Sequence, residues 1–254
     1  MAISRRQAIS MSGATLAGLS LGVRPSEAAQ AAQAPAAGAA PAEWPTSLVE
    51  MPPRAGFPAA LPLLPDGSAP EHNASEAGPI TPPLFWRTQG RVTPQLPTPQ
   101  NMAIKVDTRG LGRLGGTLKF SDLEKLPRVT ATYLLQCGAA NPRGIVTWSG
   151  VRFSDFANMI GLNPGVHYGR FVSVDGHYVD EDMTTLRHRQ VMLAWMMNGQ
   201  TLSADHGAPL RLIVPFRYGN RSIKAISEIS FGTPGLPFPP APLAAPAPAG
   251  GRGA

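Results

Sequence analysis

The sequence predicts one α+β domain, between residues 84 and 232, from three observations. Segments such as 102–110 and 168–180 alternate apolar and polar residues, which is typical of half-buried strands. Helical patterns are few, and strands and helices neither alternate regularly nor repeat, which favours α+β over a doubly wound sheet. The 28 prolines cluster before residue 100 and after residue 233, so the domain is shorter than the chain of 254 residues.

Within the domain, apolar periodicity and turn residues predict the elements in order. A helix with Ser121 as its N-cap and Glu124 three residues later follows a short strand, and a second helix has Ser154 as its N-cap. The β-branched and apolar segment 128–137 is a strand that ends at Cys137. An apolar segment, 187–202, contains the turn pair Asn198 and Gly199. The remaining strands are expected at 102–110, 168–180, 209–216 and 222–231.

The segments outside the domain have different compositions. Residues 1–31 carry Arg5 and Arg6 before a mildly apolar stretch and resemble a twin-arginine export signal, which predicts a periplasmic protein and contact with the twin-arginine export machinery. An ordinary secretory signal or an amphipathic helix is the alternative. The apolar stretch is too short for a stable membrane span. Residues 32–83 form a Pro/Ala-rich linker, expected to contact the domain through Trp44, Phe57 and the leucines at 61–64, and residues 233–254 are a disordered Pro/Ala tail.

Composition excludes several functions. A single cysteine, Cys137, rules out an intramolecular disulfide, and the net charge of +6 comes without any basic run that would bind nucleic acid. Arginines outnumber lysines by 18 to 4, and the planar arginine fork suits small anionic substrates and phosphates. Cys137 is therefore a packed residue, a reactive thiol or a metal ligand. None of His167, His177, His188 and His206 has a local signature for a nucleophilic pair with it.

A second cluster of candidate residues lies toward the C-terminus. His206 and Arg211 lie around a turn, and Arg221, Ser222 and Lys224 follow in what the pattern predicts to be the next strand. On a strand Ser222 and Lys224 share one face, so a hydroxyl and an ammonium converge on one anion, together with backbone amides near Gly219. The alternative is a solvated basic strand face.

Four segments in order carry a family resemblance: "PLFWRTQGRVTP", "LLQCGAANPRG", "VMLAWMMNGQTLSADHGAPLRLIVP" and "YGNRSIKAI". Together they resemble the molybdenum-cofactor domain of the sulfite oxidase family, a group that includes bacterial periplasmic relatives. The resemblance covers residues 84–232 and implies a mixed-sheet sulfite-oxidase-like molybdopterin-binding fold. It implies a molybdopterin-dependent oxidoreductase that carries out two-electron oxygen-atom transfer on a small oxyanion or sulfoxide.

The resemblance also implies roles for particular residues. Cys137 is expected to ligate molybdenum through its thiolate, a soft donor. Arg87 and Arg143 are expected to bind the substrate oxyanion and, with Cys137, to be the catalytic residues. The expected cofactor contacts are Phe85, Arg87, Gln89, Asp175, His206, Arg211, Arg221, Ser222, Ile223 and Lys224.

The sequence departs from the family pattern at three places. Gln89 stands where the family has histidine, the residues after Cys137 read "GAANPR" in place of "AGNRR", and no tyrosine follows in "GLPFPPAPLAAP". The absence of a CxxCH motif predicts no haem in this chain, so electrons must be exchanged with a separate protein such as a c-type cytochrome. The alternatives are a non-catalytic molybdopterin-fold scaffold subunit and a cysteine-nucleophile hydrolase.

Overall fold

The computed structural model describes residues 47–50, 60–79, 95–137 and 143–240. The chain divides into two units, 1–53 and 54–254, and every helix and strand named below lies in the second. None of the helices among the described residues is long and apolar enough to cross a membrane.

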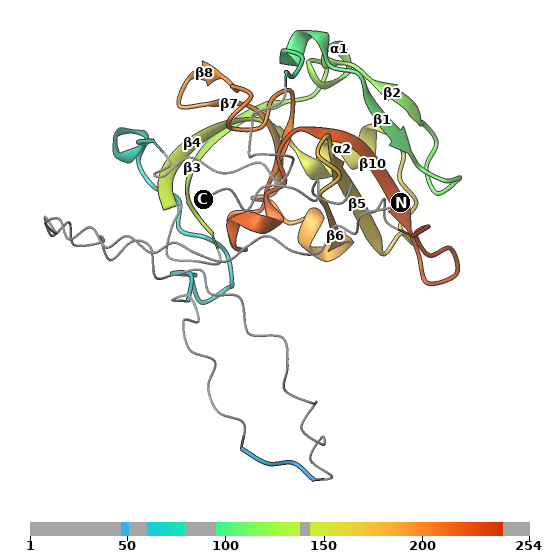
Figure 1. Cartoon of the computed structure of the whole chain (residues 1–254), viewed down its shortest axis with the longest axis horizontal. Helices are drawn as coiled ribbons and strands as arrows, with labels where there is room; N and C mark the ends of the chain where they lie inside the picture. Colours follow the sequence, from blue (N-terminus) through green and yellow to red (C-terminus); the bar gives the residue numbers. More distant parts are fainter. Residues whose placement is uncertain (1–46, 51–59, 80–94, 138–142, 241–254) are drawn as a thin grey trace, which may run out of the picture. The chain divides into compact units, whose positions relative to one another are not determined.

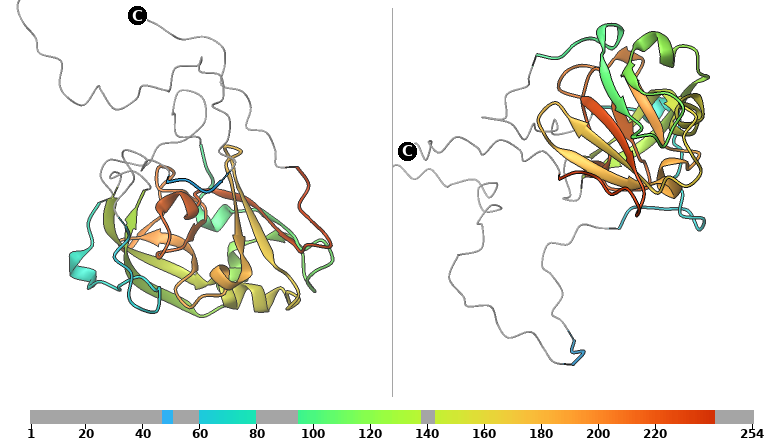
Figure 2. Two further views of the ribbon diagram at one scale, coloured as in Figure 1. Left: turned by 90° about the horizontal axis from the view of Figure 1, so that it is seen from below. Right: turned by 90° about the vertical axis from the view of Figure 1, so that its right-hand side faces the viewer.

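Two five-stranded sheets build the second unit (Figure 1). One has the order β2-β1-β10-β5-β6; β1 and β10 run parallel and the other neighbours antiparallel, so this sheet is mixed. Its strands are β1 (Ile104–Asp107), β2 (Gly116–Leu118), β5 (Tyr168–Ser173), β6 (Tyr178–Asp182) and β10 (Ile226–Gly232). Figure 2 shows β10 between the β1–β2 pair and the β5–β6 hairpin.

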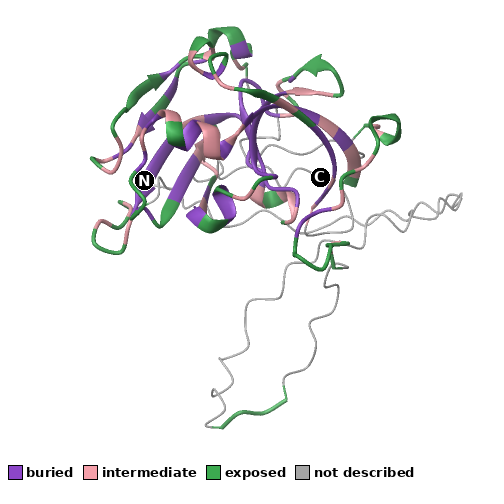
Figure 3. Cartoon of the chain, turned by 180° about the vertical axis from the view of Figure 1, so that it is seen from behind, coloured by how far each residue is buried: buried purple, intermediate pink, exposed green. Residues whose placement is uncertain are grey.

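The other sheet is antiparallel, with the order β3-β4-β7-β8, and β9 pairs with β7. Its strands are β3 (Arg128–Gln136), β4 (Arg143–Arg152), β7 (Met192–Met197), β8 (Gln200–Thr201) and β9 (Arg211–Ile213). The exposed tip of the β7–β8 hairpin is the predicted turn: Asn198 and Gly199 both have positive φ, as a two-residue hairpin turn requires (Figure 3).

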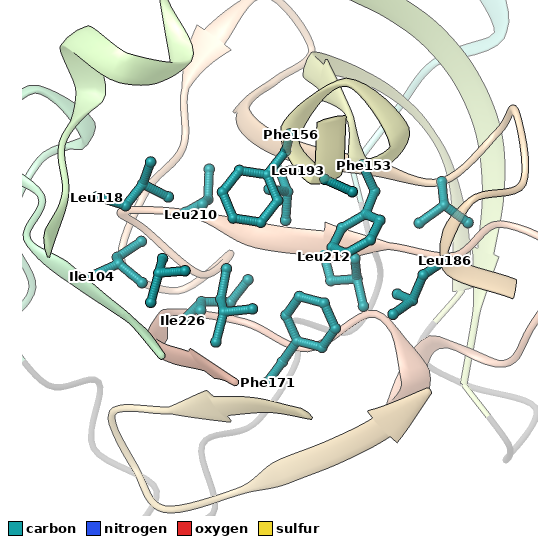
Figure 4. Packing of buried hydrophobic residues seen from close by; sticks show 14 of the residues in the cluster. Ile104, Leu118, Phe153, Phe156, Phe171, Leu186, Leu193, Leu210, Leu212 and Ile226 are labelled. Carbon is teal, nitrogen blue, oxygen red and sulfur yellow. The ribbon is translucent and has the colours of Figure 1, made fainter. Parts of the chain in front are cut away.

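The helices are short: α1 (Phe120–Leu123), α2 (Phe153–Met159), α3 (Met183–Leu186) and the 3₁₀ turns η2 (Ala74–Glu76), η4 (Pro99–Asn101) and η5 (Gly219–Arg221). Phe153 and Phe156 of α2 pack against residues of both sheets, among them Phe171 of β5 and Leu212 of β9 (Figure 4). This core fixes the mixed sheet to the antiparallel one. The predicted α+β class and mixed sheet are confirmed.

Both predicted helix starts are wrong. Helix α1 begins at Phe120, and its N-cap is Lys119. The backbone N–H of Lys119 donates to the Asp122 carboxylate (3.0 Å), so the capping side chain is that of Asp122 and not that of Ser121. Helix α2 begins at Phe153, one residue before Ser154, because β4 continues as far as Arg152. The sequence did not predict β4: long-range pairing with β3 and β7 determines it.

Part of the predicted linker packs on the antiparallel sheet. Ala69 exchanges two hydrogen bonds with the Gln190 side chain (2.9 and 2.8 Å), and the His72 N–H donates to the Thr132 carbonyl of β3 (2.9 Å). Leu63 and Leu64, expected to make the contact, are 43% and 44% exposed instead. Trp44 and Phe57 lie outside the described residues.

Candidate functional site

Cys137 follows the last residue of β3 and is partly exposed. The β3–β4 ladder continues without a break to the pair Gln136–Arg143, so the exposed Arg143 lies opposite the residue that precedes the cysteine. The strand predicted at 128–137 therefore places both residues at the same end of the hairpin. The residues that join them, 138–142, lie outside the described part of the chain.

The turn η5 packs directly beside this end of β3. A Cβ built on Gly219 would lie 3.3 Å from the carbonyl oxygen of Gln136, so only the smallest residue allows this approach without displacement. The segment "YGNRSIK" and the cysteine strand are therefore neighbours, although about 80 residues separate them.

Arg211 is the central cation of the site, and it is fully buried on β9. Its Nη1 donates to the carbonyl oxygen of His206 (2.8 Å) and its Nη2 to that of Ser222 (2.9 Å). Among the described residues, its Nε has no hydrogen-bond partner and no carboxylate forms an ion pair with it. Burial lowers the pKa of Arg211 to about 9, the direction expected of a cation without a neutralising anion.

His206 and Lys224 are brought together by a close backbone approach. Gly207 has a φ of 105°, and a Cβ there would lie 2.7 Å from Cβ of Lys224; the Ala225 N–H donates to the Gly207 carbonyl (3.0 Å). Burial, and then the charge of Arg211, lowers the pKa of both side chains, to about 8 for Lys224. Nδ1 of His206 is buried without a partner among the described residues.

Ser222 and Ile223 lie on a loop, because β10 begins only at Ile226. The predicted strand face shared by Ser222 and Lys224 is therefore wrong. Ser222 is buried, its Oγ accepts a hydrogen bond from the Val214 N–H (2.9 Å), and the carbonyl of the buried Ile223 accepts one from the Leu212 N–H (3.0 Å). These bonds hold the loop against β9 and keep it from extending the strand.

The two other described residues of the predicted set are Asp175 and Arg221. Asp175 is in the β5–β6 turn and its charge raises the pKa of Lys224, which places it near the ammonium. Arg221 forms an ion pair with Glu181 of β6 and donates to the carbonyl oxygen of Asp180. Phe85, Arg87 and Gln89 lie outside the described residues.

Sequence reasoning missed Trp148. It is fully buried on β4, Cζ of Arg211 lies 4.8 Å from its ring centre, and its Nε1 has no partner among the described residues. The alternation of "GIVTWSGV" would have indicated an inward-facing tryptophan if the segment had been recognised as a strand.

The site thus combines a buried cation with buried polar atoms that lack hydrogen-bond partners among the described residues, as an anion-binding site requires. Arg211 Nε, His206 Nδ1 and Trp148 Nε1 are buried and unpartnered within the described part of the chain, and a cationic Lys224 lies beside them. Buried polar groups are ordinarily paired, so the arrangement fits a phosphorylated cofactor. No group of three or more His, Cys, Asp and Glu side chains that could hold a metal ion occurs among the described residues.

Comparison with known proteins decides the family. Residues 93–234 match the family described as "Oxidoreductase molybdopterin binding domain". The chain belongs to this family. The molybdopterin-binding domain and its relatives confirm the predicted membership of the sulfite oxidase family. The implied cofactor is the molybdenum cofactor, and the buried atoms above that lack partners fit it.

Curated relatives match only parts of their own length. The sulfite oxidase of Arabidopsis thaliana is 28% identical in an alignment of 202 positions, which covers 65% of this chain and 51% of that protein. The protein-methionine-sulfoxide reductase catalytic subunit MsrP of Ralstonia nicotianae is 27% identical over 147 residues, covering 50% of this chain and 43% of that protein. Among solved structures, the sulfane dehydrogenase SoxCD of Paracoccus pantotrophus matches with a TM-score of 0.49 and 22% identity, over 55% of this chain and 40% of that chain. The chain therefore spans about half the length of the sulfite oxidase that it matches.

Proposed function

We propose that this chain is a molybdenum-cofactor-dependent oxidoreductase acting on a small oxyanion or sulfoxide. The observation that carries the proposal is Arg211: a fully buried guanidinium with an unpartnered Nε and no carboxylate within ion-pair distance among the described residues. An uncompensated buried charge is destabilising, and a bound phosphate would neutralise it. When bound, the cofactor supplies two-electron oxygen-atom transfer.

The residues around Arg211 would hold the pterin and its phosphate. Lys224 and the 222–224 backbone lie on one side, His206 on another, and Asp175 beside Lys224. Trp148 would form the floor beneath the guanidinium. Phe85 and Gln89 complete the predicted set.

Cys137 would supply the protein's ligand to molybdenum. It is a partly exposed residue at the end of β3, and the approach of Gly219 to Gln136 puts the 219–224 loop next to it. A thiolate is a soft donor suited to such a metal, whose charge stabilises the deprotonated form.

Substrate binding would fall to Arg143, with Arg87 as the second cation. Arg143 is exposed at the start of β4 and paired in register with Gln136, so its guanidinium is available beside Cys137 to an oxyanion. Relatives named sulfite oxidase and methionine-sulfoxide reductase support this substrate class.

The two electrons would leave or enter through a separate redox protein, such as a c-type cytochrome. Residues 1–31 support folded export to the periplasm by the twin-arginine route, where such cytochromes act.

Metal and pterin analysis of the exported protein tests the proposal. We expect one molybdenum and one pterin per chain, together with turnover of sulfite or a sulfoxide with artificial electron acceptors or donors. Cofactor without turnover on any substrate of a broad panel would favour the scaffold alternative. A folded protein that never contains molybdenum would refute the proposal.

A further inference from the structure

The ion pair between Glu181 and Arg221 has no role in the cofactor contacts above. Val179 and Glu181 share the buried face of β6, and Glu181 is only 5% exposed. A buried carboxylate is tolerated where a cation compensates it, and Arg221 is the cation that contacts it. Arg221 also donates to the Asp180 carbonyl of the same strand, so its guanidinium is anchored twice to β6.

Arg221 is the last residue of η5, which is held on two other sides. Gly219 lies against the Gln136 carbonyl beside Cys137, and the Ser222 carbonyl and Oγ bond to Arg211 and to the Val214 N–H. The anchor to β6 is the third. Three anchors in different directions determine where the 219–224 segment, including Lys224, lies relative to Cys137.

We propose that Glu181 is a positioning residue for the cofactor: it orients Arg221, and through it the loop that would bind the phosphate. The proposal rests on the proposed function and assigns Arg221 to this loop anchor in place of the direct cofactor contact expected from the sequence. Groups that orient a ligand's contacts typically change its affinity when removed, although they never touch it.

The test uses the cofactor-loaded protein and the isosteric variant Glu181→Gln. Its rate of molybdenum loss, followed by metal analysis after desalting well below the melting temperature, should rise roughly 10- to 100-fold. Glu228→Gln is the matched control, since Glu228 forms an exposed ion pair with Lys105 (3.2 Å) on β10, and its loss rate should equal that of the wild type.

A double-mutant cycle separates positioning from general destabilisation. Arg221→Gln combined with Glu181→Gln should lose molybdenum no faster than either single variant, because both changes remove one anchor. The double variant buries no unpaired charge. If a single variant fails to fold, the molybdenum loss of the double variant is compared directly with that of the wild type. Wild-type retention in Glu181→Gln, or independent effects in the double variant, would overturn the inference. A wild-type protein without molybdenum would instead refute the proposed function.

Discussion

The guanidinium of Arg211 lies over the indole of Trp148, with 4.8 Å between Cζ and the ring centre, and both side chains are fully buried. The ring partly compensates a cation that has no carboxylate partner among the described residues. This pair joins β4 to β9. Strand β4 begins opposite the end of β3, the strand that Cys137 follows.

Replacing Trp148 by leucine should reduce both stability and cofactor retention. The loss of packing and of the cation–π contact should lower the free energy of unfolding by about 2–4 kcal/mol, measured by urea denaturation of cofactor-free protein. Trp195→Leu is the control, since Trp195 is also buried but packs edge-on against Phe120 (5.4 Å). Both variants should be less stable, and only Trp148→Leu should release molybdenum faster. Equal release would contradict the role of Trp148 in the site.

Stability of the cofactor-free protein should depend on the titration of Lys224. Its pKa is lowered from 10.5 to about 8 in the folded state, chiefly by burial, so the unfolded chain binds more protons between these values. The contribution of Lys224 to the free energy of unfolding is therefore least favourable below pH 8 and rises with pH toward about 10. Lys224→Met should show its largest stability gain over the wild type at pH 7, and the gain should shrink as the pH rises. A difference that is constant with pH would exclude this titration.

Cys137→Ser should separate folding from metal binding. Cys137 is partly exposed after the end of β3, so the free energy of unfolding should change by about 0.5 kcal/mol or less in cofactor-free protein. Molybdenum content and turnover should both be lost, because a hydroxyl is a much poorer ligand than a thiolate. X-ray absorption at the molybdenum edge gives an independent check, since the wild type should contain one metal–sulfur bond more than any Cys137→Ser protein that retains molybdenum. Full turnover in the variant would refute the ligand assignment.

Gly150→Ala should disrupt the sheet that carries the site. A Cβ at this position would lie 1.9 Å from the Leu193 carbonyl oxygen and 2.7 Å from Cα of Ala194, at the irregularity in the β4–β7 ladder. We expect a loss of about 3 kcal/mol or more, measured by thermal unfolding. Gly78→Ala, where an added Cβ meets nothing within 4 Å, should be nearly neutral. Similar melting temperatures for the two variants would show that the ladder can shift.

Local sequence signals were sufficient for part of the site. The β-branched pattern before Cys137 predicted β3, and Asn198 with Gly199 predicted the hairpin turn that the structure contains. Order and spacing of the motifs indicated that His206, Arg211 and Lys224 act together, and hydrogen bonds and close backbone contacts join their segments. The strand and the turn depend on residues that are close together in the sequence. The grouping of the site residues depends on the order of motifs that can be read from a single sequence.

By itself, then, the sequence determined the family, the α+β class and the residue types of an anion site beside a cysteine. Only the tertiary structure decided the existence of β4, the loop conformation of Ser222, the pairing of Arg221 with Glu181 and the stacking of Arg211 on Trp148. The pairing of β4 with β7, the Arg221–Glu181 ion pair and the Arg211–Trp148 contact each join residues more than 30 positions apart in the chain. The Ser222 loop is held by bonds to Arg211 and Val214, which belong to another segment of the fold. Long-range strand pairing and the compensation of buried charge select among conformations that local propensity leaves equally available.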